Sequence, residues 1–275
     1  MNGERKNENK ISKSTTKRVS INNNDILVIP ATRTTFVDEI LPGVKKVTLS
    51  QNQYLLFQRY LGYGESNKYF YPDIAARITM SKANYDLQKF CFPDAKIYNV
   101  PVFIDDKLFS YKQWKKQQII YMPRRNRSDS DALINCLKYR NRLCGFSIIA
   151  VDGLKQDKVA QIYKDSLIFL SFSKREGFGL PPAEAMACGC IVIGYSGNGG
   201  DEFFHDDLCF KIVEGDLLNF AETIESVIEE YLTDPTRLDE LRRRASDYIL
   251  QSYPKDRTES ILLDAWSEIL TLKTQ

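Results

Sequence analysis

The chain has 275 residues, 43% of them apolar and 27% charged, which is enough for one large or two modest α/β domains. Its formal net charge is +2, but removing the six basic and two acidic residues of the first twenty leaves 32 basic against 34 acidic residues. This balance argues against a nucleic-acid-binding protein, which would carry its basic excess on the folded surface.

The cysteines and histidines form no recognisable metal or redox motif. Among six cysteines only Cys188 and Cys190 lie close together, and they lack the C-x-x-C spacing of redox and zinc sites. We therefore expect buried, reduced thiols. Because His205 is the single histidine, a His-rich metal centre is excluded, and neither a metal ion nor a cofactor is expected.

The sequence also lacks membrane and export signals. No apolar run reaches the roughly 18 residues of a transmembrane helix. The amino terminus has no apolar core of a signal peptide. A cytoplasmic protein is therefore expected, one that could still rest on a membrane surface.

In chain order, residues 1–22 come first and should form a disordered tail, because they lack the apolar side chains whose burial offsets the entropy of ordering. Residues 23–110 then alternate β-rich runs with helical stretches, the pattern of a parallel sheet covered by helices. Strands are expected at 26–30, 46–49, 77–80 and 97–100, and helices at 36–40, 53–61 and 82–92.

Residues 111–255 predict a second and clearer unit of the same kind. Its strands are continuous apolar runs, as expected when helices cover both faces of a sheet. They are expected at 118–122, 147–151, 167–172, 191–194 and 209–212, with helices at 129–140, 156–164 and 182–187. Three amphipathic helices follow at 217–232, 235–251 and 257–271. The last, within residues 256–275, should cross back onto the first unit, so the fold class is α/β with two Rossmann-type units.

One segment of the second unit combines a strand end, a glycine turn and a helix start. The strand is expected to stop at Ser173, and Gly177 and Gly179 lie in the turn before Pro181 and Pro182 begin a helix. Glycine lets the backbone approach a ligand closely, and the N–H groups at a helix start favour an anion such as a diphosphate. Ligands usually bind at this end of a parallel strand.

Two glutamates flank this turn. A carboxylate beside a phosphate is repelled, so Glu176 and Glu184 are better suited to accepting hydrogen bonds from the hydroxyl groups of a sugar or a ribose. The alternative is structural: Glu184 would interact with the helix dipole and Glu176 would be a solvated loop residue.

The spacing Glu176-x(7)-Glu184, within residues 175–189, resembles the E-x(7)-E donor-site motif of the retaining GT-B glycosyltransferases called group 1. The resemblance extends over about residues 115–255. It implies a GT-B fold and a nucleotide-diphosphate-sugar donor, with Glu176 contacting sugar hydroxyls and Glu184 the ribose. The remaining donor contacts would come from the turn and the helix start: Gly177, Phe178, Gly179 and Leu180.

Two further segments resemble the same family. Arg124 and Arg125 follow the first strand of the second unit, where the family places an Arg and a Lys that pair with the donor diphosphate. The usual Lys is missing, and a basic surface loop is the alternative. Gly199 and Gly200, within the glycine-rich segment 196–202, resemble the family's turn near the sugar.

The first unit departs from the family pattern. It resembles only the second half of the family's acceptor-binding domain, without the usual glycine turn and without a histidine, and is expected to be truncated. His205 is expected to be structural or to line the donor loop. The resemblance also implies that retaining transfer needs no dedicated base, with the leaving diphosphate helping to accept the acceptor's proton.

Three functions remain open. The first is a hexosyltransferase acting on a nucleotide sugar and a glycan, lipid or small-molecule acceptor. The second is a non-catalytic nucleotide-sugar-binding protein, which could need a partner subunit or form an oligomer. The third is an epimerase of the same fold, which would require further acids and a histidine in the cleft.

Overall fold

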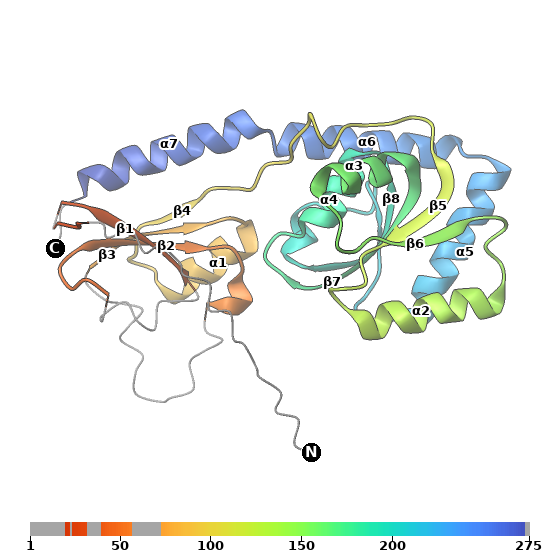
Figure 1. The fold of residues 1–275 in the computed structure, drawn as a ribbon, viewed down its shortest axis with the longest axis horizontal. Coiled ribbons are helices and arrows are strands. Elements are labelled where there is room, and N and C mark those ends of the chain that lie inside the picture. The colour runs from red at the N-terminus through yellow and green to blue at the C-terminus, as the bar shows by residue number, and fades with distance from the viewer. Residues whose placement is uncertain (1–19, 23, 32–39, 57–72, 273–275) are drawn as a thin grey trace, which may run out of the picture.

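The structure is a computed structural model that describes residues 20–22, 24–31, 40–56 and 73–272. They form two α/β lobes side by side, with one long helix returning from the second lobe to the first (Figure 1). The described residues do not include most of the expected tail. They include only the last residue of the expected helix 36–40. The second half of the expected helix 53–61 also lies outside them, and its described start is a short 3-10 helix, η2 (Gln53–Leu55).

The first lobe contains a parallel sheet of four strands in the order β1-β2-β3-β4. Its strands are β1 (Ile26–Pro30), β2 (Lys45–Ser50), β3 (Ile74–Thr79) and β4 (Ile97–Asn99). Helix α1 (Lys82–Cys91) connects β3 to β4 and begins at Ser81, whose side chain accepts a hydrogen bond from the N–H of Asn84. All four expected strands are present, with ends displaced by up to three residues.

The second lobe contains a parallel sheet in the order β6-β5-β7-β8-β9. Its strands are β5 (Lys116–Tyr121), β6 (Ser147–Ala150), β7 (Ser166–Glu176), β8 (Ile191–Asn198) and β9 (Phe210–Lys211). Five helices cover it: α2 (Arg127–Arg140), α3 (Gln156–Asp165), α4 (Leu180–Ala187), α5 (Leu217–Thr233) and α6 (Thr236–Ser252).

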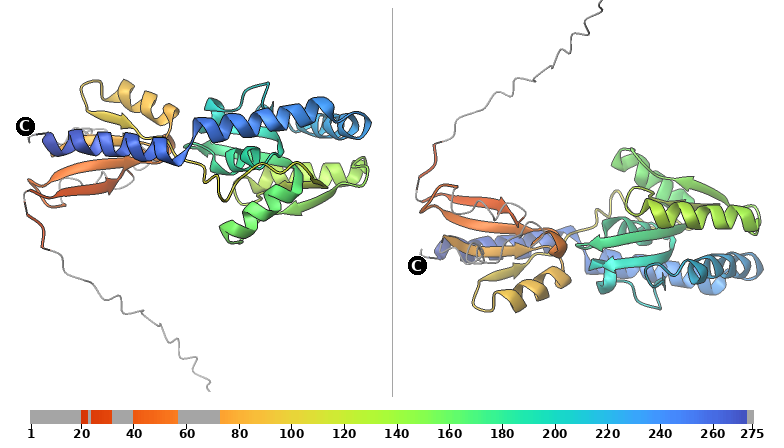
Figure 2. Two further views of the ribbon diagram at one scale, coloured as in Figure 1. Left: turned by 90° about the horizontal axis from the view of Figure 1, so that it is seen from above. Right: turned by 90° about the horizontal axis from the view of Figure 1, so that it is seen from below.

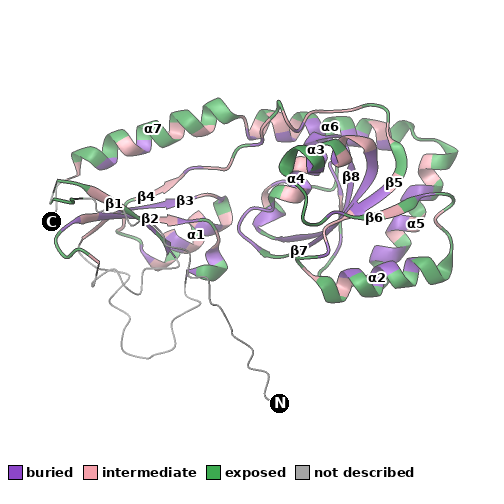
Figure 3. Ribbon diagram, in the orientation of Figure 1, coloured by how far each residue is buried: buried purple, intermediate pink, exposed green. Residues whose placement is uncertain are grey.

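Both faces of this second sheet are buried. Alternate residues of β7 point to opposite sides, so Phe169 packs in a cluster with α3, α4 and α6, whereas Ile168 packs with α2 and α5. The central strands are accordingly buried along most of their length (Figure 3). This explains why they are continuous apolar runs in the sequence.

Helix α7 (Lys255–Thr271) leaves the second lobe and lies along the first (Figures 1 and 2). Its Ala265 and Ile269 pack in one cluster with Val47 and Ile78 of the first sheet. At the edge of the sheet Lys96 forms an ion pair with Glu268 at 2.9 Å. The chain therefore crosses between the lobes twice, once before β5 and once before α7.

Two expectations are corrected by the structure. Strand β7 continues to Glu176 rather than ending near Phe172, because β8 also continues, to Asn198, and pairs with it across a bulge. The thiols are all free but not all buried, since Cys136 and Cys144 are exposed and Cys91 is half-buried. Among the described residues, no helix is both long enough and apolar enough to span a membrane.

Candidate functional site

The two glycine turns expected near the donor meet at the end of β7. Glu176 pairs with Asn198 in the sheet, which places Gly199 directly against Gly177. A Cβ on Gly199 would lie 2.4 Å from the carbonyl carbon of Gly177, so only glycine allows this approach. The structure therefore brings together segments that are more than twenty positions apart in the sequence.

The start of α4 has fewer free backbone N–H groups than the four that a helix usually presents at its amino terminus. Gly179 is the N-cap, with a positive φ of 99°, and Leu180 is the first helical residue. The next two residues are Pro181 and Pro182, which have no N–H. The N–H groups of Gly179 and Leu180 are thus the donors that this end of α4 can present to an anion.

Glu176 lies within reach of one of the two predicted arginines. Its Oε1 is 3.2 Å from Nε of Arg125, whose side chain is 51% exposed, whereas that of Glu176 is 10% exposed. Burial raises the pKa of Glu176, and the positive charge of Arg125 partly offsets this. A carboxylate and a cleft-facing guanidinium therefore stand together at the end of β7.

Glu184 lies in the first turns of α4 and has a different environment. Burial raises its pKa to about 7, although a hydrogen bond with Gln156 acts in the opposite direction. Together with Leu180 it lines a cavity between the lobes. The two glutamates therefore lie at separate places around the start of α4.

Arg124 and Arg125 both line a crevice of about 130 Å³ at the carboxyl ends of β5 and β6. Its opposite wall is formed by Asp152, Gly153 and Leu154, directly after β6. Pro181 of α4 completes the crevice, which links the arginines to the helix start. The loop 152–154 was not singled out from the sequence, although its position after a parallel strand was a usable signal.

The first lobe is hydrogen-bonded to the same glycine turn. Nδ2 of Asn52 donates to the carbonyl oxygen of Arg175 at 2.8 Å, and Nε2 of Gln53 donates to that of Glu176 at 3.1 Å. A Cβ on Gly177 would lie 1.9 Å from the carbonyl oxygen of Gln51. These residues follow β2, and their proximity to the turn could be seen only in the tertiary structure.

The side chains of Phe178 and His205 pack against other aromatic residues, and Gly200 is buried in a short helix. The ring of Phe178 is buried and packs on Phe203 and Tyr253, at centroid distances of 5.0 and 4.9 Å, so only its backbone can face a ligand. Gly200 is buried in η4 (Gly199–Glu202) behind Gly199. His205 is exposed and packs edge-on against Tyr248 at 5.4 Å.

Comparison with known proteins finds a family whose model matches part of the second lobe. Residues 139–251, which include the glycine turns, Glu176 and Glu184, match the family described as glycosyl transferases group 1. The matched residues form most of the second lobe, from the end of α2 to the end of α6. Arg124 and Arg125 lie outside the matched residues.

Further similarity is found by sequence and by structure. An alpha-1,6-glucosyltransferase of Actinobacillus pleuropneumoniae serotype 7 is 35% identical over 89 residues, which are 31% of this chain and 27% of that protein. The structure of the pneumococcal O-GlcNAc transferase GtfA with UDP and GlcNAc aligns with a TM-score of 0.64 at 15% identity, covering 92% of this chain and 58% of that one.

Two more solved structures support the same fold. A TarM mutant of S. aureus, in complex with fondaparinux, alpha-GlcNAc-glycerol and UDP, aligns with a TM-score of 0.61 at 15% identity, over 90% of this chain and 55% of that one. The structure of Anabaena Alr3699/HepE with UDP and glucose aligns with a TM-score of 0.62 at 12% identity, over 88% of this chain and 78% of that one. The fold is GT-B, and the chain spans little more than half the length of TarM and GtfA.

Proposed function

We propose that this chain transfers a hexose-type sugar from a nucleotide-diphosphate-sugar to an acceptor hydroxyl, with retention of the anomeric configuration. The observation that carries the proposal is the cluster around the start of α4. Arg125 lies 3.2 Å from Glu176 on one side, and Glu184 occupies the following helical turn. This arrangement offers positive charge for a diphosphate and two carboxyl groups for hydroxyls.

In the proposed reaction the bond between the anomeric carbon and the diphosphate oxygen breaks, and its electron pair leaves with the diphosphate. The acceptor oxygen bonds to the same carbon from the same face, and its proton passes to the leaving diphosphate. Arg124, Arg125 and the N–H groups of Gly179 and Leu180 would stabilise the negative charge that develops. This scheme assigns that role to the protein rather than to a metal ion.

The proposed roles of the two glutamates follow from their surroundings. Glu176 lies at the glycine turn beside Arg125 and would orient the sugar through its hydroxyls. Glu184 would bind the ribose, and with a pKa of about 7 its carboxyl group can accept and, when protonated, donate a hydrogen bond. Because the structures of GtfA, TarM and HepE contain UDP, UDP-sugars are the first donors to test.

The test is calorimetric titration of the purified chain with UDP-glucose, UDP-GlcNAc and GDP-mannose, followed by assays of donor hydrolysis and transfer. Binding of one donor together with slow hydrolysis is expected, and NMR of the product should show a retained anomeric configuration. Absence of binding to every nucleotide would refute the proposal. Binding without hydrolysis or transfer would instead support a nucleotide-sugar-binding protein that needs a partner.

A further inference from the structure

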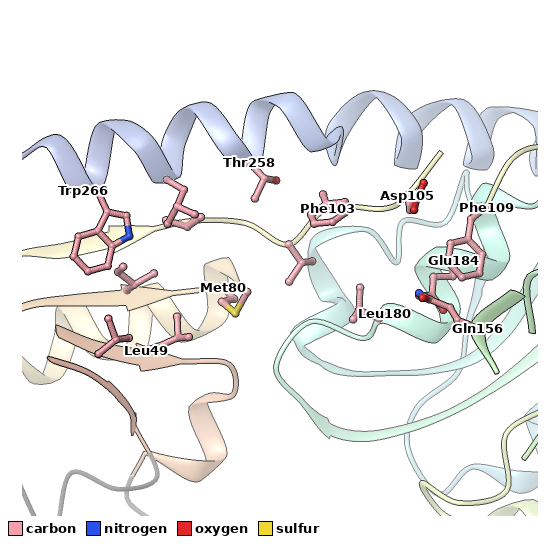
Figure 4. A pocket seen from close by; sticks show the side chains of 15 residues that line it. Leu49, Met80, Phe103, Asp105, Phe109, Gln156, Leu180, Glu184, Thr258 and Trp266 are labelled. Carbon is pink, nitrogen blue, oxygen red and sulfur yellow. The ribbon is translucent and has the colours of Figure 1, made fainter. Parts of the chain in front are cut away.

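A cavity of about 590 Å³ lies between the lobes, beside the candidate donor site (Figure 4). Its floor is the face of the first sheet that carries Leu49 and Ile78, and its roof is α7 with Leu262 and Trp266. At the other end it reaches Glu184 in α4. Its volume lies within the roughly 300–1,000 Å³ typical of small-molecule sites.

The lining of this cavity is strongly asymmetric. Asp105, Gln156 and Glu184 gather at the end next to the second lobe (Figure 4). The part under α7 is lined almost entirely by apolar side chains, including Leu49 and Trp266. A ligand that fits both ends must carry polar groups at one end and hydrocarbon at the other.

We propose that this cavity binds the hydrocarbon chain of an amphiphilic acceptor, such as a long-chain alkyl or isoprenoid compound with a hydroxyl-bearing head. That the ligand is an acceptor rests on the proposed function. The head would lie near Leu180 and Gln156, next to the helix start that faces the donor, and the hydrocarbon chain would run beneath α7.

The apolar lining of the cavity favours an amphiphilic acceptor over a wholly polar one. The hydroxyls of a free oligosaccharide would lose their water against Leu49, Ile78 and Trp266 without gaining hydrogen-bond partners. A hydrocarbon chain instead gains free energy from leaving water, and each buried CH₂ should strengthen binding about fourfold. Because the cavity extends as far as Glu184, a hydrocarbon chain bound in it would lie beside the proposed transferase site.

Tryptophan fluorescence can test the proposal without any donor. The chain has two tryptophans, and Trp114 is 81% exposed, whereas Trp266 lines the cavity. In a Trp114→Phe background, 10-bromodecan-1-ol should quench Trp266 by contact with bromine, and its half-maximal concentration should be at least tenfold lower than that of 6-bromohexan-1-ol. Equal quenching by the two alcohols, or none, would overturn the proposal.

Neighbouring residues of α7 provide a matched pair of variants. Leu262 lines the cavity, whereas Leu263 is 68% exposed and is not part of its lining. In the same background, Leu262→Glu should weaken binding of 10-bromodecan-1-ol at least tenfold, and Leu263→Glu should change it less than twofold. Equal effects of both variants at unchanged melting temperatures would contradict a chain beneath α7.

A transfer assay separates this inference from the proposed function. If the inference is right, decyl glucoside should have a lower KM than methyl glucoside, and Leu262→Glu should raise only the KM of the decyl compound. Chain-length-dependent quenching without nucleotide binding would refute the proposed function but retain an apolar ligand site. Transfer to methyl and decyl glucoside with equal KM would retain the function and refute the amphiphilic acceptor.

Discussion

At the scale of single residues, Glu176 and Glu184 differ in the groups that restrain their side chains. Glu176 is restrained by the sheet and by Arg125, whereas Glu184 is on a helix and has a neutral partner, Gln156. The difference predicts separate kinetic effects. If Glu176 contacts the sugar as proposed, Glu176→Gln should mainly lower kcat in steady-state kinetics, because that contact would matter most as bonds change.

Glu184→Gln should weaken UDP binding about tenfold, because an ionised carboxylate accepts hydroxyl hydrogen bonds more strongly than an amide does. Since the pKa of Glu184 is about 7, its ionised fraction grows as pH rises from 6 to 8. Wild-type affinity should therefore rise over that interval, and the variant's affinity should not. Calorimetry at three pH values checks this, with the exposed Glu229→Gln as control. A variant with the wild-type pH dependence would exclude Glu184 as the titrating contact.

Arg125 should contribute more to catalysis than an ordinary surface arginine. Arg125→Ala removes a guanidinium that lines the crevice and touches Glu176, so kcat/KM should fall about 10- to 100-fold. Steady-state kinetics should show little change for Arg142→Ala, whose side chain is exposed on the outer side of the lobe. Similar losses in the two variants would indicate a general effect of charge.

At the scale of elements, the site depends on β7 and β8 extending together until their glycine turns touch. Gly199→Ala places a methyl group 2.4 Å from the backbone of Gly177, which cannot move without shifting β7. We expect a loss of about 1–3 kcal/mol in the free energy of unfolding and weaker UDP binding. Its neighbour is a close control: in Gly200→Ala the methyl group meets side chains rather than backbone, the ring of Phe204 at 3.3 Å and that of Phe203 at 3.4 Å. Chemical denaturation of both variants tests this, and equal stability would contradict the tight approach.

At the scale of the whole molecule, the half-buried carboxyl group of Glu202 joins the lobes. Glu202 of η4 accepts a hydrogen bond from the backbone N–H of Lys82 at the start of α1, where a helix favours negative charge. Its Oε1 is nevertheless buried without a hydrogen-bond partner among the described residues. Burial raises its pKa from 4.5 to about 7.

This raised pKa has a defined consequence for stability. A group whose pKa is higher in the folded state stabilises the fold fully below its unfolded pKa, and the contribution is lost as pH rises through the folded value. Ionisation of Glu202 should therefore cost stability between about pH 4.5 and 7, by about 1–2 kcal/mol once partial solvent screening is allowed for. Glu202→Gln should flatten this decline in denaturation curves measured at pH 5, 6 and 7. An unchanged slope would show that Glu202 does not titrate in this interval.

Most elements of the second lobe could be predicted because each carries its own local signal. The apolar run of β7 and the paired prolines at the start of α4 indicate a strand and a helix without any knowledge of the rest. Strand ends were harder, since the extension of β7 to Glu176 depends on its partner β8. The loop 152–154 was missed because its role comes from the crevice it shares with Arg125.

The sequence by itself determined the fold class and the motif from Glu176 to Glu184, because periodicity, glycine positions and this spacing are encoded within short segments. Only the tertiary structure decided that Gln53 reaches the glycine turn, that Arg125 pairs with Glu176, and that an apolar cavity lies beneath α7. These features join residues about 50 to 220 positions apart. Their proximity arises from the packing of two lobes and a returning helix, which no local pattern records.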